Sequence, residues 1–427
     1  MPHNPWVKDS VGGFSNYMAV DQAKGTRSYA ASAYYNLVRG RDNVDVLTGA
    51  VVEKVLFARG SAEATGVQYQ HGSQAKTATA RKEVILAAGA SQSPKLLELS
   101  GVGRRDILER YDIPVIVDLP HVGENLQDHL ICEIGFEALD STPTKDGIMR
   151  QESEVLQKGT EEFTTSQTGP LTSSGLVTYA YMPTVSLSSP GGSKELAGLL
   201  ERHRPTPEGL SVEELARARA YYEIAEKALI DPEQPSAGYT TLPHHIPTIS
   251  DPMTGEITFD LLPGNHISFL ATLSHPLSRG NVHIRSADAS DQPAIDFKYL
   301  SHPADLEILA EHVLHLHTLA ASAPLSDLLK QPITPSRSLS NFSDLEGARD
   351  YVRLRATTMW HPAGTCAMLP RDKGGVLDPS LRVYGAAKLR VVDASAVPLL
   401  PVANLQSTIY AMAERAADLI KEEHGLK

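Results

Sequence analysis

Two polar residues near the C-terminus of this 427-residue chain have side chains suited to acid–base chemistry. His361 lies between Trp360 and a Pro-Ala-Gly turn, and Asn404 opens the polar stretch Asn404–Ser407. An imidazole accepts a proton near neutral pH, and a neighbouring amide can hold the oxygen that loses it without competing for that proton. The alternative is structural, because a single histidine beside a Pro-Gly turn is more often a hydrogen bonder than a base.

Composition narrows the class of protein. Apolar residues make up 41% and charged residues 21% of the chain, as in ordinary globular proteins. The net charge of −12 argues against nucleic acid or an anionic membrane as a partner. Two cysteines, Cys132 and Cys366, provide neither a disulfide framework nor a thiolate metal site. The sequence shows no signal peptide and no run of about 18 apolar residues, so we expect a cytoplasmic protein by default.

The element that could hold a nucleotide is a strand–turn–helix unit. Residues 84–88 are wholly apolar and predict a strand covered on both faces. Ser93 can cap the helix that follows, Pro94 suits its first turn and Gly101 can end it. In open α/β sheets, nucleotides bind at the edge where such a strand ends. An ordinary βα unit would have the same pattern.

The middle of the chain has strands that regular helices do not separate. The Ser/Thr/Gly/Pro-rich segments 144–169 and 183–195 indicate loops. Ser211 and Glu214 predict a capping box for a helix that runs to Ile230. An apolar stripe predicts a second helix over 305–319. Alternation and turn residues predict an antiparallel sheet from residues 257–262, 267–273, 282–284 and 295–297, before a strand at 389–392 and a helix at 407–421 return to the first region.

Metal binding is not predicted. His244, His245 and His266 have no ligand spacing with nearby acids or cysteines, so a surface or core role is favoured for each.

Several motifs together resemble the glucose-methanol-choline (GMC) family of flavin-dependent oxidoreductases, from about Gly25 to the C-terminus. The matching segments are 25–28, 89–94, 99–103, 122–129, 168–173, 359–366, 393–394 and 404–407. The resemblance implies that His361 is the base, that Asn404 is its partner and that the cofactor is FAD. It places Val52 at the adenine, Asp393 and Ala394 at the ribose and pyrophosphate, Gln406 and Ser407 at the isoalloxazine carbonyl, and Trp360 along the ring. It gives Asp128 and His129 a structural role that links two domains.

The family's N-terminal strand, Gly-x-Gly-x-x-Gly turn and helix are not found. The nearest string, residues 101–106, has Asp106 where the third glycine belongs and follows a helix. We therefore expect the first βαβ unit to be missing and predict that this chain alone binds FAD poorly.

The predicted fold is α/β (α+β overall). Residues 1–124 and 366–427 would form a partial Rossmann-like FAD-binding domain, with an inserted antiparallel substrate-binding domain at 125–365. Three functions stay open: a GMC oxidoreductase acting on a small alcohol, a flavin-independent lyase, cyclase or isomerase that uses His361, and a non-catalytic remnant. The expected partners are a small-molecule substrate and either a complementing chain or further copies in a homo-oligomer.

Overall fold

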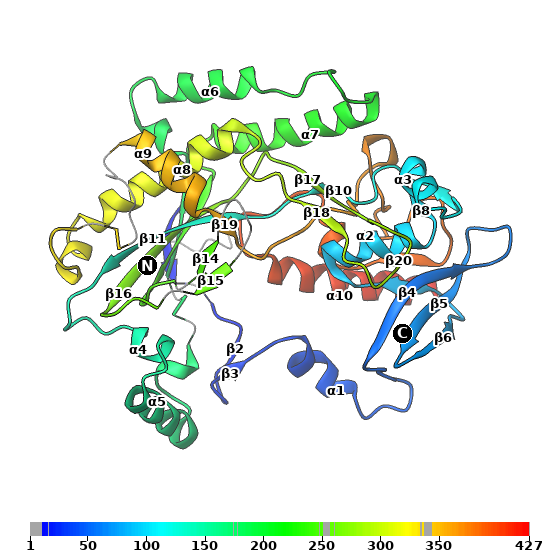
Figure 1. Cartoon of the computed structure of the whole chain (residues 1–427), viewed down its shortest axis with the longest axis horizontal. Helices are drawn as coiled ribbons and strands as arrows, with labels where there is room; N and C mark the ends of the chain where they lie inside the picture. The colour runs from blue at the N-terminus through cyan, green and yellow to red at the C-terminus, as the bar shows by residue number, and fades with distance from the viewer. Residues whose placement is uncertain are drawn as a thin grey trace.

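The computed structural model describes residues 11–426 apart from 16, 174, 177, 247, 251–256, 260, 334 and 337–343. Figure 1 shows two regions along the long axis, with a large sheet under α8 and α9 on the left and smaller sheets around α2 and α10 on the right. Helices and strands are mixed throughout, so the predicted α/β (α+β overall) class is confirmed.

A six-stranded antiparallel sheet forms the left region. Its strand order is β1-β12-β13-β16-β11-β19. The central strand β16 is buried along almost its whole length, because α8 packs on it and strands flank it on both sides. The strands are β1 (Gly12–Ser15), β11 (Leu130–Glu137), β12 (Thr178–Met182), β13 (Ala237–Leu242), β16 (His266–Leu273) and β19 (Thr357–Thr358).

Helices pack on this sheet and beside it. α8 (Pro303–Ala320) buries Leu309, Val313 and Leu316 in one cluster with the strands, as the apolar stripe predicts. α9 (Leu345–Arg355) lies beside α8 (Figure 1). α7 (Val212–Leu229) begins at the predicted capping box, in which Ser211 and Glu214 each bond the other's backbone.

Two predicted loops are wrong. Residues 144–169 contain α4 (Asp146–Met149) and α5 (Ser153–Ser166), and residues 183–195 contain a 3-10 turn followed by the start of α6 (Gly192–Arg202). Local composition misled the prediction because tertiary packing stabilises a helix more than propensity does. In α6, Leu196 and Leu200 are buried in a cluster with Tyr222 of α7.

The right region joins distant parts of the chain. β7 (Val84–Leu86) pairs in parallel with β20 (Leu389–Val391), and each strand leads through a turn to a helix, α2 (Gly89–Leu99) or α10 (Leu405–Glu423). The expected cover on both faces of β7 is wrong, since Ile85 is 44% exposed. Among the described strands β7 has β20 as its one partner, so it sits at a sheet edge.

The remaining elements are short or peripheral. β4 (Ala50–Phe57), β5 (Ala64–His71) and β6 (Gln74–Thr79) form an antiparallel meander. The others are β2 (Val20–Asp21), β3 (Thr26–Arg27), a π-helical turn (Ala31–Tyr35) that continues into α1 (Asn36–Val38), β8 (Val102–Gly103), α3 (Arg105–Arg110), β9 (Val117–Asp118), β10 (Glu124–Leu126), β14 (Thr248–Ser250), β15 (Ile257–Phe259), β17 (Gly280–His283) and β18 (Ala294–Asp296).

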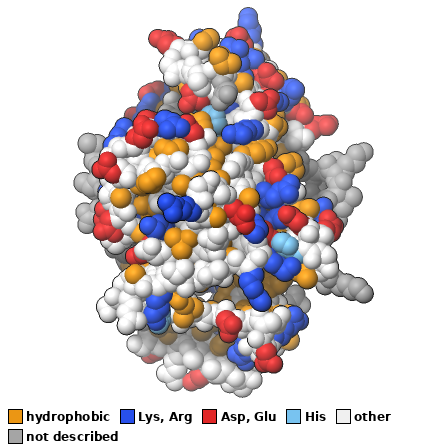
Figure 2. Space-filling model, turned by 90° about the vertical axis from the view of Figure 1, so that its right-hand side faces the viewer, with side chains coloured by type: hydrophobic (Ala, Val, Ile, Leu, Met, Phe, Trp, Pro, Cys, Tyr) orange, Lys and Arg blue, Asp and Glu red, His pale blue; other side chains and the backbone are white. Residues whose placement is uncertain are grey.

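Acidic and basic side chains are interspersed among apolar ones on the face in Figure 2. Of the helices in the described ranges, none is long and apolar enough to cross a membrane. Residues 12–15 join the antiparallel sheet as β1, so the segment before residue 125 contributes strands to both regions.

Candidate functional site

A cavity of about 770 Å³ lies between the N-terminal segment, β12 and the start of α10. Asn404, Gln406 and Ser407, three predicted site residues, line it. None of the described lining residues is charged, so the cavity suits a neutral ligand. Aromatic rings form much of its wall: Phe14, Tyr17, Tyr29, Tyr34, Tyr179, Tyr181 and Tyr410.

The N-terminus of α10 faces this cavity. Asn404 is the N-cap residue, yet its side chain makes no capping hydrogen bond. Its Oδ1 instead accepts a hydrogen bond from the Tyr179 hydroxyl at 3.2 Å. Burial raises the pKa of Tyr179, so this hydroxyl keeps its proton. The first-turn N–H groups of Gln406 and Ser407 therefore stay available to a ligand, at the positive end of the helix.

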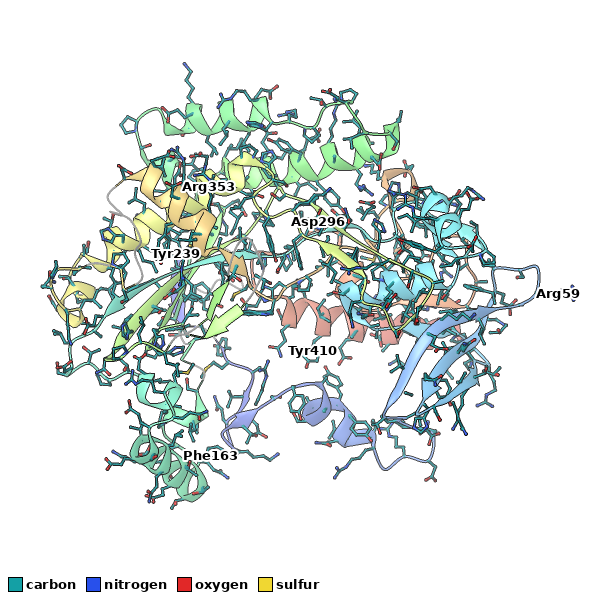
Figure 3. All side chains as sticks on the ribbon, in the orientation of Figure 1. Arg59, Phe163, Tyr239, Asp296, Arg353 and Tyr410 are labelled. Atoms are coloured by element: carbon teal, nitrogen blue, oxygen red, sulfur yellow. The ribbon has the colours of Figure 1, made fainter. Side chains whose placement is uncertain are left out.

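An aromatic stack closes one side of the cavity. Tyr410 points from α10 toward the segment that contains α1 (Figure 3), and its ring stacks on Tyr34 with centroids 5.7 Å apart. The Tyr34 hydroxyl donates to Glu414 Oε1 at 2.7 Å. The N-terminal segment is thus attached to the same helix that presents Asn404.

Antiparallel pairing places His361. Leu130 lies opposite Thr358 in the β11–β19 ladder, and the Met359 N–H donates to the His129 carbonyl at 2.9 Å. The chain then turns so that the two imidazoles meet, with Nδ1 of His129 and Nδ1 of His361 only 2.9 Å apart.

The same pairing continues past His361. Ala363 and Gln127 form a bridge, and Gly364 packs against Asn125. A Cβ on Gly364, whose φ is +95°, would lie 2.5 Å from the Asn125 carbonyl oxygen. Only glycine allows the loop that contains His361 to approach this closely.

The carboxylate of Asp128 fixes the backbone around His361. Its Oδ1 accepts the His361 N–H at 2.8 Å, and its Oδ2 accepts the Tyr299 hydroxyl at 2.5 Å and the Thr358 hydroxyl. Trp360 adopts a left-handed φ of +57° between these contacts, and its side chain is 67% exposed.

Burial keeps both imidazoles neutral. It lowers the pKa of His361 to about 4, and burial together with the nearby His361 lowers the pKa of His129 to about 3. Within the described part of the chain, the hydrogen bonds of His361 use its Nδ1 and its backbone N–H, and none of them uses Nε2. His361 is therefore a neutral imidazole.

Asp393 ends β20 against the first turn of α2. Its Oδ2 accepts the Gly89 N–H at 3.0 Å and the Ser93 hydroxyl at 2.5 Å, and its Oδ1 accepts the Ser395 N–H at 2.8 Å. Ser93 is therefore not the helix cap that the sequence predicts, since α2 already begins at Gly89. A carboxylate of the chain itself occupies this helix N-terminus.

The predicted site residues fall into four places. Asn404, Gln406 and Ser407 line the cavity, whereas Trp360 and His361 lie beside His129 and are not among its lining residues. Asp393 and Ala394 lie at α2, where the Ala394 carbonyl accepts the Gly364 N–H at 3.1 Å. Val52 lies on β4 opposite Tyr69, packed against a core cluster. Pro401 connects the first two places, because it lines the cavity and its backbone faces the His129 ring.

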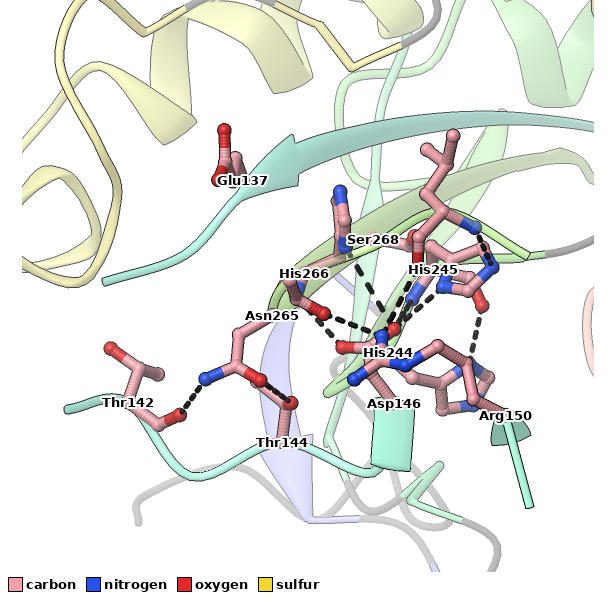
Figure 4. Close-up of polar contacts among 12 residues, drawn as sticks. Glu137, Thr142, Thr144, Asp146, Arg150, His244, His245, Asn265, His266 and Ser268 are labelled. Atoms are coloured by element: carbon pink, nitrogen blue, oxygen red, sulfur yellow. Dashed lines mark hydrogen bonds and ion pairs between the residues drawn. The ribbon is translucent and has the colours of Figure 1, made fainter. Parts of the chain in front are cut away.

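A buried Asp–His cluster, which the sequence did not indicate, lies in the left region (Figure 4). Asp146 Oδ1 lies 2.6 Å from His245 Nδ1 and 3.8 Å from His266 Nδ1. The His245 ring already uses its other nitrogen, because Nε2 accepts the Leu262 N–H at 3.2 Å. Asp146 also accepts the backbone N–H groups of His245 and His266, so we assign it the role of a clamp between three segments.

Two family models, both described as GMC oxidoreductase, match residues 3–131 and 276–413. A dehydrogenase of Armillaria gallica is 34% identical over 415 residues, which cover 96% of this chain and 62% of that protein. An FAD-dependent oxidoreductase from Chaetomium thermophilum superimposes with a TM-score of 0.82 at 27% identity and covers 97% of this chain and 68% of its own. A fungal aryl-alcohol oxidase superimposes with a TM-score of 0.78 at 29% identity, and the match covers 94% of this chain and 65% of that oxidase. The chain thus spans about two thirds of the length of the proteins it resembles.

Proposed function

Because the chain belongs to the GMC oxidoreductase family, we propose that it oxidises the CH–OH group of a small alcohol with His361 as the base. The state of His361 supports this most: it is neutral, and its hydrogen bonds to other described residues leave Nε2 unused. One similar structure is an aryl-alcohol oxidase, and the uncharged aromatic cavity would suit an alcohol of that kind. His361 does not line this cavity, but Pro401 lines it and also faces the His129 ring beside His361.

The chain's own groups would handle the hydroxyl. Nε2 of His361 would accept its proton. Asn404 Oδ1 is held by Tyr179, which leaves the amide N–H groups to donate to the substrate oxygen as negative charge develops there. The hydride from the alcohol carbon would be accepted by a bound flavin.

The described residues fit FAD at its ring end. Gln406 and Ser407 would hold the isoalloxazine carbonyl region with free N–H groups at the start of α10. They fit less well at the diphosphate end, because Asp393 fills the N-terminus of α2, where a diphosphate could otherwise bind. We therefore expect FAD to bind weakly unless a complementing chain or a second copy supplies the remaining contacts.

Because Asp393 occupies the N-terminus of α2, a second candidate is favoured as well. This candidate is a flavin-independent lyase, cyclase or isomerase that uses His361 as acid and base. An absorbance spectrum of the purified chain, with and without added FAD, followed by turnover of aryl alcohols with an artificial electron acceptor, separates the two. Flavin-dependent aldehyde formation that His361→Ala lowers by roughly 10²- to 10⁴-fold supports the oxidoreductase. A colourless chain that converts a substrate without added acceptor supports the second candidate.

A further inference from the structure

The contact between His129 and His361 is a hydrogen bond between two like groups. The rings meet edge to face at 78°, with Nδ1 of each 2.9 Å from Nδ1 of the other. Two bare nitrogens would repel each other at this distance, and two protonated ones would clash. One proton therefore lies between them, and the ring that owns it determines the tautomer of both rings.

The two arrangements have opposite consequences for the base. If Nδ1 of His361 donates, its Nε2 has a free lone pair and can accept a proton. If Nδ1 of His129 donates, the proton of neutral His361 sits on Nε2, which then cannot accept another. Only the first arrangement makes His361 a base.

We propose that His129 is a positioning residue that accepts the Nδ1–H of His361 and thereby holds the base in the tautomer with a free Nε2. This inference rests on the proposed function, because only a base needs the free Nε2, but the tautomer can be measured without any turnover.

The proposed function sets this direction, because a base needs a bare Nε2 and His361 has one only when its own proton is on Nδ1. In this arrangement the proton of neutral His129 sits on its buried Nε2.

The imidazolium form of His361 is consistent with the same hydrogen bond, in which His361 donates and His129 accepts. When Nε2 takes the alcohol proton, the alcohol O–H bond breaks, an N–H bond forms and His361 becomes an imidazolium. Its Nδ1–H still donates to the lone pair of His129. His129 itself stays neutral, because it is 1% exposed and a second charge beside the first is disfavoured. A charge on His275 would also lower the pKa of His129. Burial lowers the pKa of His275 itself to about 4, so His275 is neutral too.

Asp128 does not take this role. Its carboxylate accepts the backbone N–H of His361 and the hydroxyls of Tyr299 and Thr358, so it fixes the position of the loop. The described contacts of the His361 ring assign its orientation to His129 alone.

The test reads the tautomer directly. Protein labelled with ¹⁵N-histidine is examined by long-range ¹H–¹⁵N NMR at pH 7, with the His361 signals assigned by their loss in His361→Gln. We expect wild type to show His361 protonated at Nδ1. His129→Leu, which removes the acceptor, should shift His361 to the Nε2–H form. His129→Asn, which can place an amide oxygen near the position of Nδ1, should retain the Nδ1–H form.

A matched control is His312→Asn. His312 is also fully buried with a pKa lowered to about 3, but it bonds Ser236 and Tyr239 and should leave His361 unchanged. Where turnover is measurable, His129→Leu should lower kcat by roughly 10- to 100-fold, the usual effect of losing a partner that orients a functional histidine, with KM little changed.

An Nε2–H His361 in wild type, or an unchanged Nδ1–H form in a folded His129→Leu, would overturn the inference. If His129→Leu does not fold, the wild-type and His129→Asn spectra still show whether His361 carries its proton on Nδ1 or on Nε2. Absence of alcohol oxidation with the expected tautomer would reject the proposed function and leave the role of His129 supported.

Discussion

The carboxylate of Asp393 bonds the Gly89 backbone at 3.0 Å, 304 residues earlier in the chain. This contact joins the segment after β20, which leads on to α10, to the turn after β7, where α2 begins.

Replacing Asp393 with Asn should destabilise the chain by roughly 2 to 3 kcal/mol, because a buried charged acceptor loses bonds to Gly89 and Ser93. Chemical unfolding measures this. The chain contains a natural control, since Asp288-Ala-Ser290 repeats the tripeptide Asp393-Ala-Ser395 with the same local bonds but at the surface. Asp288→Asn should have little effect, and equal losses in both variants would contradict the role of the long-range bonds.

Stability in acid should depend on Asp146. Burial alone would raise its pKa, but hydrogen bonds from His245 and His266 outweigh burial and lower the pKa to about 2. A carboxyl group whose pKa is lower in the folded than in the unfolded protein stabilises the fold at pH values above its unfolded pKa of about 4. This stabilisation is lost as the pH falls toward 2. Urea unfolding between pH 6 and 2 should show a loss of roughly 2 kcal/mol more in wild type than in Asp146→Asn. If the free energy of unfolding fell with pH in the same way in both proteins, Asp146 would not be the clamp that we assign.

The rate of oxidation should fall in acid near pH 4 rather than near the usual histidine pKa of about 6.5. Burial disfavours the imidazolium of His361, whose pKa is lowered to about 4, so the base form is complete by about pH 6. The pH dependence of kcat/KM measures this. An acid limb centred between pH 6 and 7 would show that His361 is not the titrating base.

The N-terminal wall of the cavity should loosen when its stack is removed. Tyr410→Ala deletes the ring that contacts Tyr34, and hydrogen exchange over residues 29–38 should speed up by about tenfold at most. Tyr34→Phe keeps the stack and removes the bond to Glu414, so its effect should be smaller. No change in exchange in Tyr410→Ala would mean that other contacts hold this wall.

Periodic segments were predictable and long-range pairings were not. The apolar stripe of α8, the capping box of Ser211 and the β16 strand follow from side-chain spacing within one element, which the sequence displays. Helix α6 was missed because its buried residues Leu196 and Leu200 pack against Tyr222, which lies on another helix.

The candidate site shows the same limit. His361 and Asn404 were identifiable from their motifs, but the contact of His129 with His361 arises from the pairing of Leu130 with Thr358, which no local pattern encodes. Asp146 was likewise separated by about a hundred residues from the histidines that it bonds. Spacing along the chain could not indicate either cluster.

Trp360, exposed and one residue before His361, gives the molecule an intrinsic fluorescent reporter. The sequence contains only one other tryptophan, Trp6, so Trp6→Phe would leave a single indole. Its emission would then respond to a molecule that arrives beside His361, whether or not that molecule is ever converted. Occupancy could thus be followed in a variant without the base, with no dye attached and no coloured cofactor required.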